Sequence, residues 1–138
     1  MTQPTEIGAP QASRGMRWTG WTLSGLVILF LTMDCVMKLL DLDVVKRSTG
    51  QLGYPLYLVR PIGLIELACL VVYALPRTSV LGAILLTGLF GGAISSHLRL
   101  GDPLFTHVLF GVYVGVLAWG GLWLRSGTLR SLIPLRRA

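Results

Sequence analysis

The sequence predicts an all-α membrane protein, built as a four-transmembrane-helix antiparallel bundle. Of the 138 residues, 53% are hydrophobic and only 13% are charged, and the mean hydropathy is +0.69. These values lie outside the range of soluble domains. A helix needs roughly 20 mostly apolar residues to span a bilayer, and the chain has room for four such segments. The segments are continuously apolar rather than alternating, which argues against transmembrane strands.

The first predicted span covers residues 18–40. Trp18 and Trp21 open it, and tryptophan is enriched where membrane helices meet the interface. Asp34 and Lys38 are four residues apart, so they share one face of this helix near its end. Residues 1–17 are mostly polar or small and have little to bury, so we expect a disordered cytoplasmic tail.

The second predicted span covers residues 58–75 and follows a long connection. Residues 41–57 mix charged residues with glycine and proline, which predicts a loop, part of which lies along the membrane surface. Pro61 falls in the first turn of the span, where a proline costs no hydrogen bond. Glu66 lies inside an otherwise apolar run.

The third and fourth predicted spans cover residues 80–100 and 104–124. Both contain several glycines, small residues that let neighbouring membrane helices approach closely. Residues 18–125 therefore form one transmembrane domain, and residues 126–138 form a basic C-terminal tail without an acidic residue.

The basic residues predict the orientation of the chain. With four spans, both termini and the turn at Pro76 lie on one side, which carries most of the 12 Lys and Arg residues. The positive-inside rule then places both termini in the cytoplasm, as in a multi-pass protein of the bacterial cytoplasmic (inner) membrane. Because the net charge of +6 is accounted for by helix flanks, the expected partners are the lipid bilayer and a homo-oligomer or larger membrane complex, not nucleic acid.

Ionisable side chains from all four spans are predicted to meet at the outer face of the bundle. Antiparallel helices with short turns bring the ends of the first and third spans to the starts of the second and fourth. A charge inside a bilayer costs on the order of 3 kcal/mol even on a lenient scale, so we expect these groups to face the interior and pair. The candidate catalytic residues are Asp34, Lys38, Glu66, His97, Arg99 and His107.

Three interpretations of this cluster are open. It can be a hydrogen-bonded network that only fixes helix register, with Glu66 paired to Arg99 or a histidine. It can transfer protons to a small lipophilic substrate such as a quinone, since histidine titrates near neutral pH. A metal or haem site is the third interpretation, with Asp34, Glu66, His97 and His107 as ligands of the right types.

No motif supports the metal interpretation. The chain has neither a Glu-x-x-His pair nor a His-x-x-x-His spacing. We therefore assign no metal site and leave the cofactor unknown, with a quinone favoured over metal or haem.

Several short segments, taken in order, resemble the DoxX-like family of small four-helix membrane proteins. The segments are MDCVMKL at 33–39, LGYP at 52–55, IGLIEL at 62–67, LPRT at 75–78 and HLRLGDP at 97–103. The resemblance covers about residues 21–124 and implies a four-helix membrane bundle. Founding relatives are linked to the small membrane subunit of thiosulfate:quinone oxidoreductase and to a terminal quinol oxidase complex.

The resemblance also implies which residues matter. The acid-x-x-x-Lys element of the family corresponds to Asp34 and Lys38, and the glutamate of its second helix corresponds to Glu66. The element that runs from His to Asp-Pro corresponds to His97, Arg99 and Asp102.

The sequence thus predicts an integral membrane protein with an outward-facing polar site inside the membrane. This site is expected to bind or act on a small lipophilic or redox-active molecule, within a quinone-linked oxidoreductase complex. The alternative is a non-catalytic interaction or assembly subunit, whose polar cluster is structural and whose glycine-rich faces pack against itself or a partner. The sequence leaves open whether the chain is an enzyme.

Overall fold

The computed structural model describes residues 12–133, and these are helical with no strand. Four helical segments are long and apolar enough to cross a membrane: Arg14–Leu39, Leu56–Ala74, Ser79–Leu100 and Leu104–Arg125. The predicted fold class, an all-α bundle with four membrane-spanning helices, is confirmed.

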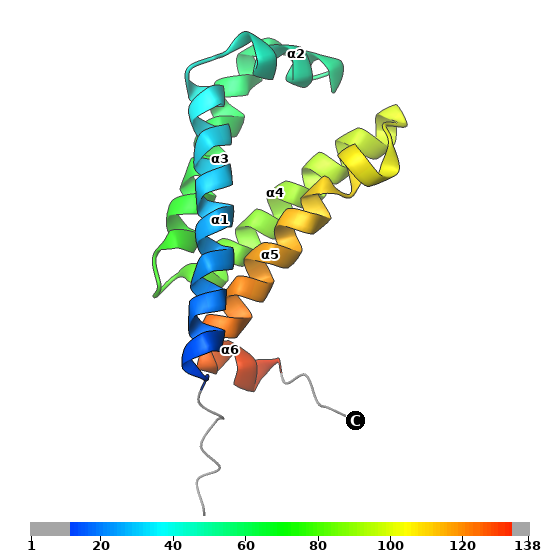
Figure 1. Cartoon of the computed structure of the whole chain (residues 1–138). Coiled ribbons are helices and arrows are strands. Elements are labelled where there is room, and N and C mark those ends of the chain that lie inside the picture. Colours follow the sequence, from blue (N-terminus) through cyan, green and yellow to red (C-terminus); the bar gives the residue numbers. More distant parts are fainter. Residues whose placement is uncertain (1–11, 134–138) are drawn as a thin grey trace, which may run out of the picture.

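Eight helical elements follow one another along the described chain. They are α1 (Arg14–Leu39), α2 (Asp43–Gln51), η1 (Leu56–Leu58), α3 (Val59–Ala74), α4 (Ser79–Leu100), η2 (Leu104–Val108), α5 (Phe110–Arg125) and α6 (Gly127–Leu132). Helix α1 packs against α3 and α5, and α4 packs against the same two helices. Figure 1 shows that α1 and α3 form one arm, α4 and α5 form a second arm, and the arms separate toward the end that carries α2.

The closed half of the bundle is centred on Tyr73 of α3. Its side chain is fully buried, and its hydroxyl donates to the carbonyl oxygen of Ala118 at 2.8 Å. The same hydroxyl lies 3.1 Å from Ser24 Oγ, so one side chain connects α3 with both α5 and α1. Leu86 and Leu122 are buried in the same core.

Two close helix contacts depend on glycine. A Cβ on Gly82 would lie 2.2 Å from the Tyr73 backbone nitrogen, so α4 touches the backbone of α3 there. A Cβ on Gly121 would lie 2.7 Å from Ser24 Oγ, which marks a similar contact between α5 and α1. The expected role of glycine is confirmed at these positions, whereas Gly88 of α4 has open space around it.

The connection between the first two spans contains a helix that was predicted as loop. Helix α1 ends in a Schellman motif, in which Asp41 has a φ of +58° and the Leu42 N–H donates to the Met37 carbonyl. The chain then turns directly into α2, which buries Val45 and Thr49 on one side. Because only these two residues of the short polar helix are buried, its sequence has no clear amphipathic period and resembles the sequence of a loop.

Helices extend into both predicted tails. Helix α1 begins at Arg14, because Ser13 caps it by accepting a hydrogen bond from the Met16 N–H at 3.3 Å. The expected disorder is therefore wrong for residues 14–17. At the other end, the predicted tail contains α6, whose Leu129 is buried and whose N-cap is Ser126. Residues 1–11 and 134–138 of the two predicted tails lie outside the described part of the chain.

The fourth span does not start as a regular α-helix. Its first turn, η2, is a π-helical turn in which Leu109 N–H donates to the Leu104 carbonyl at 2.9 Å. Such wide turns are rare and recur at functional sites. This turn carries His107.

Candidate functional site

Three charged side chains meet between α1 and α3. Lys38 Nζ lies 2.5 Å from Glu66 Oε2 and also forms an ion pair with Asp34 of its own helix. We call Asp34, Lys38 and Glu66 the charged triad. Glu66 is almost fully buried, with a side-chain exposure of 3%, whereas the exposures of Lys38 and Asp34 are 18% and 29%. The triad is therefore open on the Asp34 side and closed on the Glu66 side.

Local sequence explains how the triad forms. Asp34 and Lys38 are one helical turn apart, so they contact each other on one face of α1. Gly63 lies one turn before Glu66 on α3, and a Cβ there would lie 2.8 Å from Lys38 Cβ. Because Gly63 has no side chain, α3 approaches α1 at Lys38 and brings Glu66 to the ammonium group.

The charges of the triad do not balance. Two carboxylates share one ammonium group, so the fully ionised triad carries one excess negative charge. A buried excess charge is unfavourable unless a proton, a hydrogen-bond donor or a polar ligand compensates it. The arrangement can therefore hold and exchange a proton, or accept a polar headgroup.

A second polar group lies at the junction of α4 and η2. His97 Nδ1 donates to Asp102 Oδ2 at 2.6 Å. Gly101 makes this contact possible, because its φ of +70° ends α4 in a Schellman motif and turns Asp102 back toward His97. The rings of His97 and His107 meet edge to face with centroids 5.7 Å apart. We call His97, Asp102 and His107 the histidine group.

Replacing Asp102 by asparagine is expected to weaken the hydrogen bond that fixes the tautomer of the His97 ring. In the native protein the carboxylate accepts from Nδ1 and so fixes the tautomer protonated at that nitrogen, whereas an amide binds less strongly. Nitrogen NMR of labelled histidine checks this, and His107 is the internal control because its Nδ1 contacts Thr106 instead. An unchanged His97 spectrum in the variant would contradict the contact.

Arg99 belongs to neither group. Its Nη2 donates to the Leu52 carbonyl at 2.9 Å, in the segment between α2 and η1. Nearby, the hydroxyl of Tyr54 lies 2.7 Å from Ser96 Oγ of α4. These two hydrogen bonds connect the arms at the end that carries α2. The expected pairing of Glu66 with Arg99 or a histidine is therefore wrong, because Lys38 takes that place.

Five of the six predicted site residues thus fall into the charged triad or the histidine group, and the sixth, Arg99 of α4, binds the segment between α2 and η1. No hydrogen bond or ion pair within residues 12–133 joins the charged triad to the histidine group. Nor do three His, Cys, Asp or Glu side chains gather as potential metal ligands in this part of the chain. The predicted metal candidates, Asp34 and Glu66 on one arm and His97 and His107 on the other, are not assembled into one ligand set.

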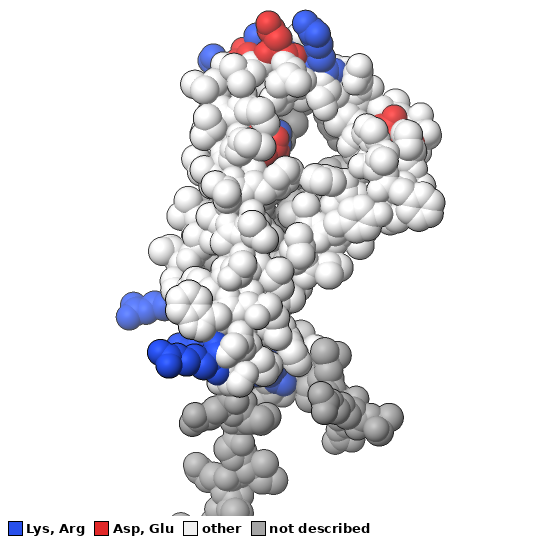
Figure 2. Space-filling view, viewed as in Figure 1, with Lys and Arg blue, Asp and Glu red and all other residues white. Residues whose placement is uncertain are grey.

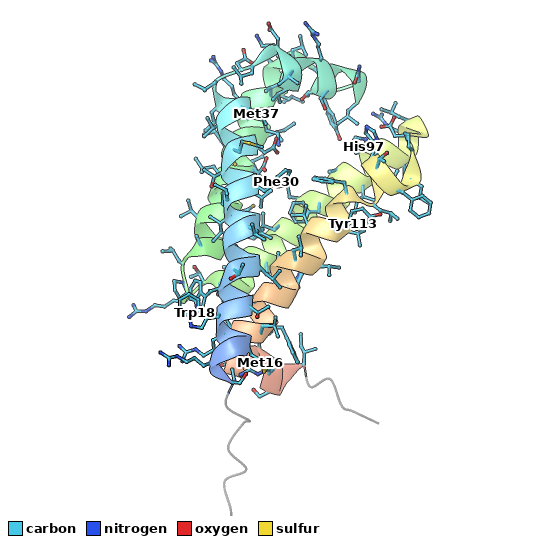
Figure 3. The ribbon with its side chains drawn as sticks, in the orientation of Figure 1. Met16, Trp18, Phe30, Met37, His97 and Tyr113 are labelled. Atoms are coloured by element: carbon cyan, nitrogen blue, oxygen red, sulfur yellow. The ribbon has the colours of Figure 1, made fainter. Side chains whose placement is uncertain are left out.

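A hollow separates the two arms. Figure 2 shows it as an opening below α2, with acidic and basic atoms visible on its wall. At its closed end, the rings of Phe30 and Phe110 meet edge to face with centroids 5.4 Å apart and connect α1 to α5. Figure 3 shows His97 on the second arm, across this space from Met37 of α1.

Sequence reasoning from the residues alone missed three parts of this region. Asp102 received a role only through the family resemblance, although Gly-Asp-Pro directly after a helix that ends near His97 is a signal for a returning chain. Tyr54 and Ser96 were missed because a long-range hydrogen bond between a loop and a helix leaves no local pattern.

A family model matches most of the chain. The model of the DoxX-like family matches residues 22–121, which cover most of α1 and all of α2 to α4 and continue into α5. No curated protein and no solved structure matches the chain.

Proposed function

The chain belongs to the DoxX-like family, and from this premise we propose that it binds a small lipophilic, redox-active molecule such as a quinone at the charged triad. In this proposal the protein is the membrane subunit of a quinone-linked oxidoreductase complex. The observation that carries the proposal is the Lys38 ammonium group held between a buried and a partly exposed carboxylate, on helices that are long and apolar enough to span a membrane. Figure 2 shows acidic and basic atoms on the wall of the hollow between these helices.

Access to the triad supports a lipophilic ligand. Phe30 and Phe110, at the closed end of the hollow, are 37% and 44% exposed although they touch each other. In a bilayer such surface is covered by lipid or by an apolar ligand, since water does not enter the hydrocarbon core. A quinone diffusing in the membrane reaches the hollow without passing through water.

The chemistry of the triad supports a carbonyl headgroup. Lys38 is a donor that can hydrogen-bond a quinone oxygen, and a carboxylate next to it can take up or release the proton that accompanies reduction. Asp34 is the partly exposed carboxylate, so it is the one that a ligand can reach, whereas Glu66 is sealed. In this scheme a partner subunit supplies two electrons, and the quinone takes up two protons to become the quinol. One proton passes through the carboxylates of the triad, and the histidine group on the opposite arm offers a second proton donor.

Replacing Glu66 by glutamine tests the proposal. The change keeps the shape but removes a charge that holds Lys38, so binding of a short-tailed ubiquinone analogue is expected to weaken roughly tenfold to a hundredfold, because a hydrogen bond to a charged group contributes about 1.5–3 kcal/mol. Quenching of tryptophan fluorescence during titration in detergent measures the affinity.

The matched control is Arg60→Gln, at an exposed arginine in the first turn of the same helix. This variant is expected to bind the analogue as the native protein does. Native affinity in Glu66→Gln, together with a lower melting temperature, would instead assign the triad a purely structural role.

The alternative function is an assembly subunit, and one observation favours it. Gly88, Gly91 and Gly92 lie on exposed surface of α4 with no atom within 4 Å of the position of a Cβ. A small-residue face of this kind suits close contact with another membrane helix. Loss of a complex on Gly88→Leu, with quinone binding absent in the native protein, would establish this function in place of the first.

We also propose that the protein lies in the bacterial inner membrane and that both its termini face the cytoplasm. Arg14, Arg17, Arg77, Arg125 and Arg130 lie at the end of the bundle that carries the termini of the described chain. The positive-inside rule supports this orientation, with the charged triad toward the outer leaflet.

A further inference from the structure

A cavity opens at the N-terminal end of α1, at the opposite end of the bundle from the charged triad. It has a volume of about 390 Å³ and is lined by Arg14, Arg17, Trp18 and Trp21. These positions follow the spacing of three and four residues that places side chains on one face of a helix. Two guanidinium groups and two indole rings on the surface of α1 therefore line one space. This space is open to the surroundings, since Trp18 is 70% exposed and Trp21 is 46% exposed.

No carboxylate of the described chain compensates the charge around this cavity. Neither Arg14 nor Arg17 forms an ion pair with any residue of the 12–133 segment. The first acidic residue in that segment is Asp34, more than halfway along α1. Figure 2 shows basic and no acidic atoms at this end among the described residues.

A third guanidinium group lies directly behind the cavity wall. Arg125 Cζ lies 4.3 Å from the centroid of the Trp21 ring, and its Nε and Nη2 are buried without a hydrogen-bond partner in the described part of the chain. Gly20 makes this proximity possible, because a Cβ there would lie 2.9 Å from the Arg125 backbone nitrogen. The positive charge of Arg125 therefore adds to the potential at a ring that lines the cavity.

We propose that this cavity binds the phosphate headgroup of an anionic phospholipid. Guanidinium groups bind phosphate oxygens through paired hydrogen bonds, and anionic lipids concentrate near basic residues at the membrane surface. Tryptophan side chains occupy the headgroup level of a bilayer, and α1 is a membrane-spanning helix that starts here.

The surroundings identify a lipid rather than a soluble phosphate as the ligand. Two of the four lining residues are tryptophans, whose indole rings offer apolar surface to the glycerol and ester region of a lipid. Further along α1, Leu26 and Leu29 are exposed and provide a surface along which acyl chains can lie. The inference is independent of the proposed quinone site, which lies at the other end of the bundle.

The test compares lipid retention by charge variants of the whole protein. The native protein, the double variant Arg14→Gln/Arg17→Gln and the control Arg77→Gln are placed in phosphatidylcholine nanodiscs that contain a small fraction of phosphatidylglycerol. Arg77 is an exposed arginine at the same end of the bundle, in the turn before α4, and does not line the cavity. Native mass spectrometry after release from the nanodisc counts the phosphatidylglycerol that stays bound.

The native protein and Arg77→Gln are expected to retain phosphatidylglycerol, and the double variant is expected to bind it roughly tenfold less tightly or worse. Circular dichroism checks that the helices of all three proteins are intact. Equal retention by the double variant and Arg77→Gln would overturn the proposal, since it would reduce the effect to overall charge. Competition by soluble glycerol phosphate at concentrations comparable with the lipid would also overturn it, because the site would then take free phosphate.

Discussion

Replacing Lys38 by methionine is expected to destabilise the protein more than any other single change at the site. Methionine keeps the length of the side chain but leaves Glu66 and Asp34 facing each other without a positive charge. Removing one partner of a buried ion pair costs about 3–5 kcal/mol, because the remaining charge stays buried without compensation. Thermal unfolding in detergent, followed by tryptophan fluorescence, should show a large fall in the melting temperature.

A double-mutant cycle shows whether this effect arises from the triad. In Lys38→Met/Glu66→Gln the second change removes the buried carboxylate that the first had left unpaired, so the double variant should be more stable than Lys38→Met alone. Destabilisations that simply add would mean that Lys38 and Glu66 do not interact in the folded protein.

Replacing Gly82 by alanine is expected to open the contact between α3 and α4. The new Cβ would lie 2.2 Å from the Tyr73 backbone nitrogen, and backbone atoms cannot give way as a flexible side chain does. A displacement of the Tyr73 backbone would also strain the hydrogen bond from its hydroxyl to Ala118 of α5. Overpacking of this kind costs about 1–3 kcal/mol, and a clash with backbone belongs at the upper end of that range.

Gly88→Ala is the matched control on the same helix. Its Cβ would meet no atom within 4 Å, so the change should leave stability unchanged or raise it by up to about 1 kcal/mol through the better helix propensity of alanine. Equal melting temperatures for the two variants would contradict the close α3–α4 contact.

The sequence predicts the spans well because hydropathy and length determine them directly. Four apolar runs of sufficient length require four helices, and short turns require antiparallel neighbours. The contact of Asp34 with Lys38 is equally local, since one helical turn separates them. These features depend on neighbours in the sequence, so no knowledge of tertiary packing is needed.

The partner of Glu66 could not be predicted from local sequence. Counting residues from the helix ends gives the depth of each side chain in the membrane, but not the direction in which it points around the helix axis. Depth alone allowed Arg99 or a histidine as partners. The missing side chain at Gly63 decides which face of α3 meets α1, and that contact selects Lys38.

Two short elements, α2 and η2, could not be predicted from sequence patterns either. Helix α2 has only Val45 and Thr49 buried, which is too few for a clear amphipathic period. The π-helical turn at His107 depends on hydrogen bonds to Pro103 and Leu104 that form only because the chain re-enters the bundle after Gly101. Separation of the arms likewise reflects tertiary packing and divides the predicted cluster into two groups.

Photoaffinity labelling tests most directly whether a quinone binds at the charged triad. The native protein in lipid nanodiscs is illuminated with an azido-quinone, and labelled peptides are identified by mass spectrometry. A quinone bound at the triad should label the α1 segment around Asp34 and Lys38 and the α3 segment around Glu66. Excess unlabelled quinone should remove this labelling, and Glu66→Gln should reduce it. Labelling spread evenly over the lipid-exposed faces of all four spans, with no competition by unlabelled quinone, would contradict a quinone site at the triad.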